Sequence, residues 1–416
     1  HSQDNMPATM PINLFLMLTM VLTGLATSLT HAVETVNPVT EGGTGGREIR
    51  VTSLGHGEGS LRDALGKKGP KTIVFEVAGV IDLQMESLEL TTPFTTIDGE
   101  SAPPPGITLI RGGISIRTHD VIVRHIRIRP GEAGAQKGSG WEADGLSTST
   151  GAHHVIIDHC SFSWATDENL SASGPRFNGN TDSEWRDGTS HDIVFSHNII
   201  AEGLSNSTHS KFEHSKGMLL HDNVTGVLII GNLFAHNMER NPLLKGGAQA
   251  MMINNLIYNP GSRALHYNLL ALEWGDRPRA PGQLTAVGNV MRAGPSTQPG
   301  LPFLMLGGQG DLHYYGEDNI AVDRWGNPLP RFGRYTTSKA RVVEQDEPRL
   351  WPRGLNILPS GQVEEWILKN AGARPRDRDA HDQRIVSDVA EGRGRIIDSE
   401  TEVGGYPDLP SPEFQR

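Results

Sequence analysis

Short runs of alternating apolar residues recur along the middle of the chain, and a polar residue or pair interrupts each run. They are HDVIVRHIRIRPG from His119, HHVIIDHCSFSW from His153, HDIVFSHNIIAEG from His191, TGVLIIGNLFAHN from Thr225, AQAMMINNLIYNP from Ala248 and GQLTAVGNVMRAG from Gly282. Alternation over so few residues predicts a β-strand rather than a helix. Each unit therefore predicts two short strands with a bend between them.

The spacing of these units predicts the fold class. Aligned on the position at the bend, the units step by 34, 38, 34, 23 and 34 residues, at positions Ile126, Cys160, Asn198, Asn232, Asn255 and Asn289. Self-similarity on this scale indicates a solenoid, in which each unit buries its apolar face against its neighbours. Short strands without long helices between them favour an all-β, right-handed parallel β-helix over a leucine-rich repeat, whose leucine consensus is absent. The 23-residue step fits a bare coil, and the longer steps fit a coil that carries a loop.

Four of the aligned bend positions are asparagines: Asn198, Asn232, Asn255 and Asn289. In a stack of coils their side chains would lie above one another at a single bend. We expect each amide to hydrogen-bond to the next, which is a structural role rather than a catalytic one.

Three segments outside the repeats complete the predicted organisation. Ser60–Leu65 has a capping serine and an apolar face, so it predicts a short helix that covers the N-terminal end of the coil. The segment 377–392 has Ile385, Val386 and Val389 at helical spacing, which predicts a tail packed on the coil exterior. We expect a flexible segment at 33–50, the β-helix at 51–323 and a loop-rich extension with a short helix at 324–416.

The apolar run from Ile12 to Leu29 is nearly uncharged and is followed by Thr30, His31 and Ala32. This pattern predicts a leader and export signal over residues 1–32, cut after Ala32. The mature protein would then be secreted and would have no stable membrane association. A membrane anchor is the alternative, because the run is close to the length that spans a bilayer.

Composition narrows the class of protein. The chain of 416 residues carries 49 glycines and 26 prolines, more than an average protein, which favours many turns. Its single cysteine, Cys160, excludes a disulfide scaffold. A net charge of −11 argues against a nucleic-acid partner, since phosphate neutralisation needs a basic surface. We expect a monomer.

Acidic residues gather on two consecutive units, with Glu142 and Asp144 on the first and Asp167 and Glu168 on the second. Asp144 and Asp167 are 23 residues apart, so superposed coils would place them about one strand spacing, ~5 Å, from each other. Carboxylates this close repel unless a proton or a cation lies between them. The pattern predicts a site for a cation with oxygen ligands, such as Ca²⁺. The alternative is that these residues are solvated loop acids.

Basic residues gather further along the chain, at Lys216, Arg240 and Lys245. A cationic cluster beside a cation-loaded acidic one would suit a polyanion, bound both through the metal and by direct contacts. Taken singly, each base could instead form a surface salt bridge.

Several of these segments resemble the pectate lyases of polysaccharide lyase family 1. The matching segments are VIIDHCSFSWATDE (155–168), MERNPLLKGG (238–247) and INNLIYN (253–259), and the resemblance covers the chain from about Val51 to Tyr258. It implies a right-handed parallel β-helix that cleaves polygalacturonate by Ca²⁺-dependent β-elimination and releases 4,5-unsaturated oligouronides.

The resemblance also implies roles for single residues. Arg240 matches the catalytic arginine, Lys216 and Lys245 match substrate-binding bases, and Asp144, Asp167 and Glu142 match acids of the calcium region. The sequence departs from the family at Ser171, where many members have a further aspartate. Either Glu168 replaces it, or Ca²⁺ binds more weakly and mainly with substrate present. Two alternatives remain open: a hydrolase on the same fold that uses Asp144, Asp167 and Glu168, and a non-catalytic, glycan-binding β-helix.

Overall fold

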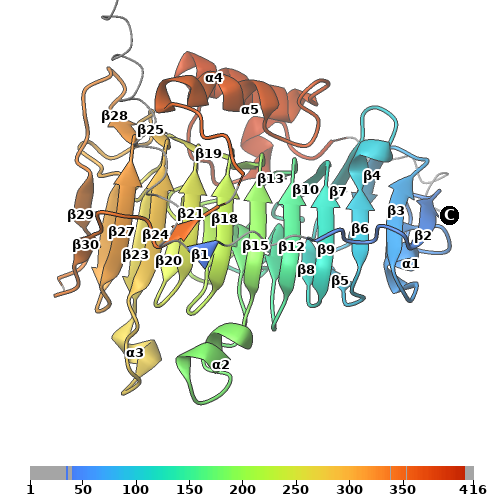
Figure 1. The fold of residues 1–416 in the computed structure, drawn as a ribbon. Helices are drawn as coiled ribbons and strands as arrows, with labels where there is room; N and C mark the ends of the chain where they lie inside the picture. The colour runs from blue at the N-terminus through green and yellow to red at the C-terminus, as the bar shows by residue number, and fades with distance from the viewer. Residues whose placement is uncertain (1–33, 36–39, 338, 353, 408–416) are drawn as a thin grey trace, which may run out of the picture.

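Three parallel sheets wind around one apolar core and form a right-handed parallel β-helix, as predicted (Figure 1). The computed structural model describes residues 34–35, 40–337, 339–352 and 354–407. The predicted leader and export signal therefore lie outside the described residues. Among the described residues, no helix has both the length and the apolar character needed to cross a bilayer.

Each complete coil contributes one strand to each of three sheets, and sheet I has one further strand at each end. Sheet I contains β2 (Arg47–Val51), β3 (Lys71–Phe75), β6 (Thr95–Asp98), β9 (His119–Arg124), β12 (His153–Asp158), β15 (His191–Ser196), β18 (Thr225–Ile230), β21 (Gln249–Ile253), β24 (Gly282–Val287), β27 (Leu312–Glu317) and β30 (Val342–Glu344). Sheet II contains β4 (Gly79–Asp82), β7 (Ile107–Ile110), β10 (Ile126–Arg129), β13 (Ser161–Ser163), β16 (Ile199–Ala201), β19 (Leu233–Ala235), β22 (Leu256–Tyr258), β25 (Val290–Arg292) and β28 (Ile320–Val322). Sheet III contains β5 (Leu88–Leu90), β8 (Ile114–Ile116), β11 (Leu146–Thr148), β14 (Glu168–Ala172), β17 (Lys216–Leu220), β20 (Leu243–Lys245), β23 (Leu265–Leu269), β26 (Leu304–Gly308) and β29 (Phe332–Arg334).

The pairing register confirms the coil lengths expected from the repeats. Val227 pairs with Ala250, so this coil holds 23 residues and carries no inserted loop. Val155 pairs with Ile193, a step of 38 residues that includes the insertion with helix α2 (Asp182–Asp187). These inward-facing side chains are fully buried and stack in columns, which is how a solenoid builds a continuous core.

The predicted asparagine ladder is present at the bend between sheets I and II. The side-chain oxygen of Asn232 accepts hydrogen bonds from the backbone and side-chain nitrogens of Asn198, at 2.9 and 3.0 Å. Asn255 and Asn289 continue the same pattern, and the ladder extends one coil further than predicted, to Asn319. The ladder satisfies buried backbone groups at a bend where strand pairing is interrupted.

The residue before each position at this bend has a left-handed backbone. The φ values are 57° for His125, 46° for His159, 56° for His197, 50° for Asn254 and 51° for Asp318, and Gly231 and Gly288 occupy the same place with 69° and 65°. A positive φ is costly for most residues, and Asn, Asp, His and Gly tolerate it best. Residue types that tolerate a positive φ at this position therefore help the chain to form the bend between sheets I and II.

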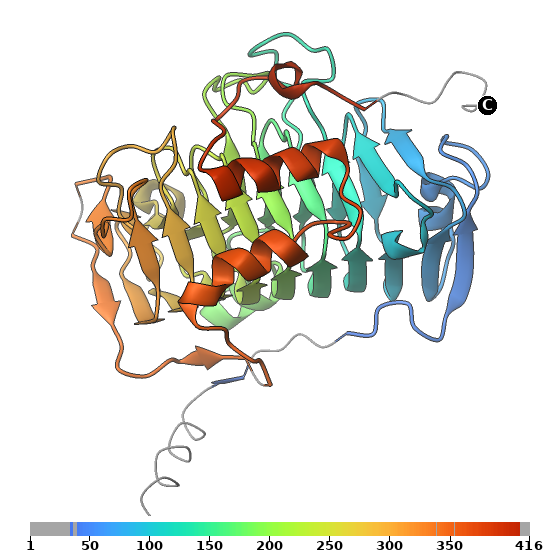
Figure 2. The same ribbon diagram turned by 90° about the horizontal axis from the view of Figure 1, so that it is seen from above.

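Helices cover the N-terminal end and one face of the coil. Helix α1 (Leu61–Gly66) begins after Ser60, whose side chain accepts a hydrogen bond from the backbone nitrogen of Asp63, and it packs against the first strands as predicted. Helices α4 (Ser360–Asn370) and α5 (Ala380–Glu391) lie side by side across sheet II (Figure 2). Ile385 and Val389 of α5 pack there, which confirms the predicted contact of the tail with the coil.

Parts of the chain outside the repeats differ from the expected organisation. Strand β2 begins at Arg47, inside the segment expected to be flexible, and β29 and β30 continue the sheets beyond residue 323. The C-terminal extension holds two α-helices rather than one short one, together with β31 (Leu350–Trp351), which pairs with β1 (Glu34–Thr35). The remaining helical elements are α3 (Ala271–Trp274) and the 3₁₀ turns η1 (Gly99–Ser101) and η2 (Glu400–Val403).

We predict that Asn232→Ala destabilises the fold by about 2–4 kcal/mol, because it leaves two buried donors of Asn198 without their acceptor. Urea unfolding followed by circular dichroism measures the change. Asn180→Ala is the control, since Asn180 lies on an exposed loop and only its backbone nitrogen is hydrogen-bonded. Equal stability losses in the two variants would contradict a stabilising role for the ladder.

Candidate functional site

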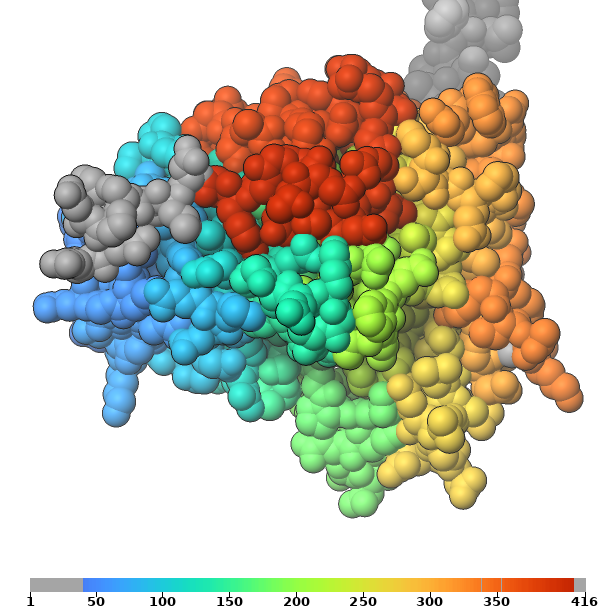
Figure 3. Space-filling model, turned by 180° about the vertical axis from the view of Figure 1, so that it is seen from behind, coloured from blue at the N-terminus to red at the C-terminus, as the bar shows by residue number. Residues whose placement is uncertain are grey.

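Nearly all the predicted site residues lie where the chain passes from sheet II to sheet III. The loops at this bend are 130–145, 164–167, 202–215, 236–242 and 259–264. Loops 130–145 and 202–215 lie side by side on the face seen from behind (Figure 3), joined by a 2.9 Å hydrogen bond from the backbone nitrogen of Gly138 to the carbonyl of Ser207. The strands that follow these loops are in register, so side chains distant in sequence meet on this face.

Asp144, Asp167 and Glu168 form the acidic cluster that the sequence predicts. One carboxylate oxygen from each lies within 4.8 Å of the other two. Leu146 pairs with Leu170, so the offset between these strands is 24 residues and Asp144 faces Glu168, whose backbone nitrogen donates to Oδ1 of Asp144 at 3.0 Å. Ser171 donates to the other oxygen of Asp144, at 3.3 Å.

The electrostatics of the cluster are those of a cation site. Burial, together with the negative charge of Asp167, raises the pKa of Asp144 well above its usual value. Burial also opposes ionisation of Asp167, but the hydrogen bond from His214, together with the electrostatic influence of His214, His209 and Arg240, outweighs it and lowers the pKa of Asp167. The surroundings of Asp144 therefore do not offset the cost of placing a further negative charge beside Asp167. A hard cation with oxygen ligands suits this donor set.

Arg240 lies directly against this cluster. Its guanidinium forms an ion pair with Glu168, and its side chain is 22% exposed. Its backbone, with a φ of 62°, donates from nitrogen to Nε2 of His266 at 3.2 Å. Burial and the charges of Arg263 and Arg240 hold the pKa of His266 well below its usual value, so His266 stays neutral and accepts this bond.

Lys216 is held by a glutamate that the sequence reading did not single out. Lys216 pairs in register with Glu168 on the neighbouring strand, and its ammonium forms an ion pair with Glu239. Glu239 also pairs with Arg263, which lies over the ring of Tyr335 at 4.0 Å. The offset of 23 residues between β20 and β23 aligns Arg263 with Arg240 in the next coil. The structure therefore adds Glu239 and Arg263 to the site.

Lys245 lies at the other end of strand β20 from Arg240. Its ammonium is 2.5 Å from Glu273 of helix α3 and 3.4 Å from Asp222. Arg176 contacts the same two acids, at 2.9 Å from Asp222 and 3.2 Å from Glu273. Lys245 thus belongs to a charge cluster at the far edge of sheet III.

Glu142 is near the acidic cluster but outside the group of three carboxylates that approach one another. Its carboxylate accepts hydrogen bonds from the backbone and hydroxyl of Ser210. The bond from the hydroxyl of Ser210 is the largest influence on Glu142 and lowers its pKa. It lies 3.6 Å from Nδ1 of His209.

We predict that Asp144→Asn stabilises the metal-free protein at about pH 8 but not at about pH 4. A carboxyl whose pKa is raised on folding favours the folded state only while it is protonated. Its charge therefore opposes folding increasingly as the pH rises from the unfolded pKa to the folded one. Asparagine is uncharged and removes this opposition.

The measurement is urea unfolding in the presence of EDTA at the two pH values. The exposed Asp276, substituted as Asp276→Asn, is the control and should show little change at either pH. A loss of stability in Asp144→Asn at about pH 8 would show that the carboxylate is not under electrostatic strain.

Comparison with known proteins identifies the family. No family model matches the chain. A protein of Emericella nidulans named "Probable pectate lyase C" is 31% identical over 378 residues, which cover 89% of this chain and 78% of that protein. A second "Probable pectate lyase C", from Aspergillus flavus, is 30% identical and covers 88% of this chain and 79% of that protein.

A solved structure supports the fold. A Bacillus subtilis pectate lyase superposes with a TM-score of 0.53 at 15% identity, covering 80% of this chain and 94% of that one. At this low identity the superposition supports the shared β-helix fold alone. The fungal relatives, in contrast, match this chain in sequence over nearly the whole coil. The fungal relatives, with which the stacked carboxylates beside Arg240 agree, show that this chain belongs to the pectate lyase family of polysaccharide lyases.

Proposed function

We propose that the chain cleaves de-esterified polygalacturonate by Ca²⁺-dependent β-elimination, with Arg240 as the base that removes the C5 proton. The observation that carries the proposal is the ion pair between Arg240 and Glu168, inside the cluster completed by Asp144 and Asp167. It supports the proposal because a guanidinium beside three carboxylates that would hold a cation could act on one uronate.

Elimination from a uronate requires removal of the proton at C5 and then loss of the glycosidic oxygen at C4. The C5 proton becomes acidic when the charge of the neighbouring carboxylate is neutralised. Asp144, Asp167 and Glu168 would hold calcium, and bound calcium would supply this neutralisation. Glu142 lies outside the three and contacts Ser210 instead.

An arginine acts as a base only if its pKa falls far below the usual value. Burial lowers the pKa of Arg240, while the charges of Asp167 and Asp144 act in the opposite direction. Burial is the larger influence, and neutralising these carboxylates would remove most of what opposes it. The backbone bond to neutral His266 holds Arg240 at the cluster, so that its guanidinium is already positioned when substrate binds.

Lys216, at the start of β17, and Lys245, at the end of β20, would bind substrate carboxylates at opposite edges of sheet III. Each is held in place by an acid, Glu239 for Lys216 and Glu273 for Lys245. A polyuronate chain would exchange these partners for its own carboxylates. Such a polymer is extracellular, which agrees with the proposed export of the protein.

We predict that Arg240→Lys lowers kcat by about 10²–10⁴-fold, the usual contribution of a positioned general base. The assay follows the absorbance of the unsaturated product. Lysine keeps the positive charge next to Glu168, so folding and polygalacturonate binding should change little. Arg331→Lys is the matched control, because Arg331 is 64% exposed and pairs only with Glu344 among the acids of the described residues. Full activity of Arg240→Lys would exclude Arg240 as the base.

Metal dependence provides a second prediction. EDTA should abolish cleavage, and Ca²⁺ should restore it better than Mg²⁺, which demands a tighter octahedral geometry. Ser171→Asp should lower the Ca²⁺ concentration for half-maximal activity, since it adds a carboxylate where Ser171 now donates to Asp144. Cleavage that persists after exhaustive chelation would rule out the metal model.

Rate should rise with pH to an optimum above about pH 8, because the base must lose a proton and the usual pKa of an arginine lies far above that pH, although burial lowers it in Arg240. De-esterified pectate should be cleaved faster than highly methylated pectin, since a methyl ester cannot bind the cation. Initial rates on both substrates across a pH series test these expectations. New reducing ends without an unsaturated product would instead indicate hydrolysis.

A further inference from the structure

Two histidines beside the acidic cluster form an arrangement that the lyase reaction does not use. His209 and His214 come from loop 202–215 and stack with ring centroids 3.8 Å apart and an angle of 14° between the planes. Both are 3% exposed. Their Nε2 atoms approach the same oxygen of Asp167, at 2.7 Å from His214 and 3.7 Å from His209.

Packing does not explain this geometry. One histidine would satisfy Asp167, and burying a second imidazole face to face with the first gains little apolar burial while desolvating a polar ring. One ligand atom each from Asp167, His209 and His214 lies within 4.8 Å of the others, as expected for the empty coordination shell of a small cation. Two imidazole nitrogens and one carboxylate oxygen suit Zn²⁺, Co²⁺ or Ni²⁺, whereas Ca²⁺ prefers oxygen ligands alone.

We propose that Asp167, His209 and His214 bind a first-row transition-metal dication. Glu142 completes the site as the partner of His209, because its carboxylate is 3.6 Å from Nδ1. Binding through Nε2 leaves the proton on Nδ1, where an acceptor stabilises it. In the metal-free form the backbone nitrogen of Lys211 donates to Nδ1 at 3.0 Å, so metal binding would exchange this bond for one to Glu142.

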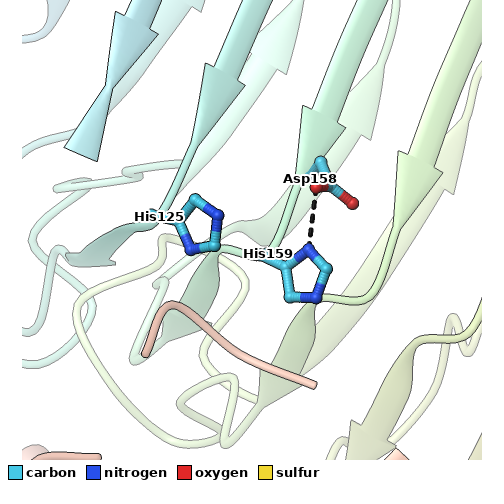
Figure 4. Close-up of side chains that lie close together, drawn as sticks. All are labelled: His125, Asp158 and His159. Atoms are coloured by element: carbon cyan, nitrogen blue, oxygen red, sulfur yellow. Dashed lines mark hydrogen bonds and ion pairs between the residues drawn. The ribbon is translucent and has the colours of Figure 1, made fainter. Parts of the chain in front are cut away.

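A second histidine cluster shows the contrast. His125, Asp158 and His159 lie at the bend between sheets I and II, and Figure 4 shows that only His159 of the two imidazoles bonds to the carboxylate. Their ring centroids are 5.1 Å apart, and Nδ1 of His125 contacts the carbonyl of Ala373. Asp158 also accepts from Ser196 and His197, at 2.6 and 2.9 Å. This carboxylate is fully engaged and is not part of the proposal.

Cobalt titration of the metal-free, full-length chain tests the site, because Co²⁺ in a nitrogen and oxygen site absorbs visible light. We expect one equivalent of Co²⁺ to give this absorption and Zn²⁺ to displace it. His214→Gln and Asp167→Asn should abolish it, and Glu142→Gln should weaken binding by about 10–100-fold. His159→Gln is the matched control and should bind as the native chain does. Circular dichroism confirms that each variant is folded.

Absence of stoichiometric absorption in the native chain would overturn the proposal. So would equal losses in His159→Gln and His214→Gln, which would indicate binding to histidines in general rather than to this site. A further arm rests on the proposed function: since Asp167 serves both sites, Zn²⁺ should raise the Ca²⁺ concentration needed for cleavage. The absorption does not depend on cleavage, so failure of the lyase activity and failure of this metal site are separate results.

Discussion

The parallel pairing of successive coils is the constraint on which every other feature of this chain depends. Backbone hydrogen bonds between neighbouring strands determine which residue lies above which, and the buried columns allow no slip by one residue without turning apolar side chains outward. The asparagine ladder carries the same register through the bend between sheets I and II. Residues far apart in sequence therefore meet at fixed separations.

The site exploits this register by placing charges of alternating sign on neighbouring coils. Glu168 faces Lys216, and Lys216 pairs with Glu239 one coil further on. Arg240 and Arg263 are aligned in successive coils with the same sign of charge, and each pairs with an acid, Glu168 and Glu239 respectively. In such a strip each side chain is held by the coil above or below it. The strain falls on the acidic end, where Asp144, Asp167 and Glu168 lie together without an equal number of bases.

The repeats were predictable from sequence because their signal is local: a few apolar residues in alternation and a polar residue at the bend. The same signal failed at Asn319, where Glu317 and Asp318 interrupt the alternation just before the bend, and at β29 and β30, which have three residues each. The acidic cluster and Arg240 could be placed because adjacent coils align them. Glu239 and Arg263 follow the same 23-residue register, but a single charged residue at a bend gives no signal until its ion-pair partner is known. The stacked pair His209 and His214 could not be placed, since the path of the inserted loop 202–215 brings them together.

The coil from Val227 to Ala250 shows what a unit of this chain requires when it carries no loop. Because its first and last residues pair in neighbouring strands, a tandem copy of this segment would insert one more coil without changing the strand pairing on either side. Lengthening by duplication would then add one more row of outward side chains for a polymer to touch. Growth of this kind would lengthen the surface along which a linear substrate can bind. The number of coils could then change in evolution without a change in the catalytic residues.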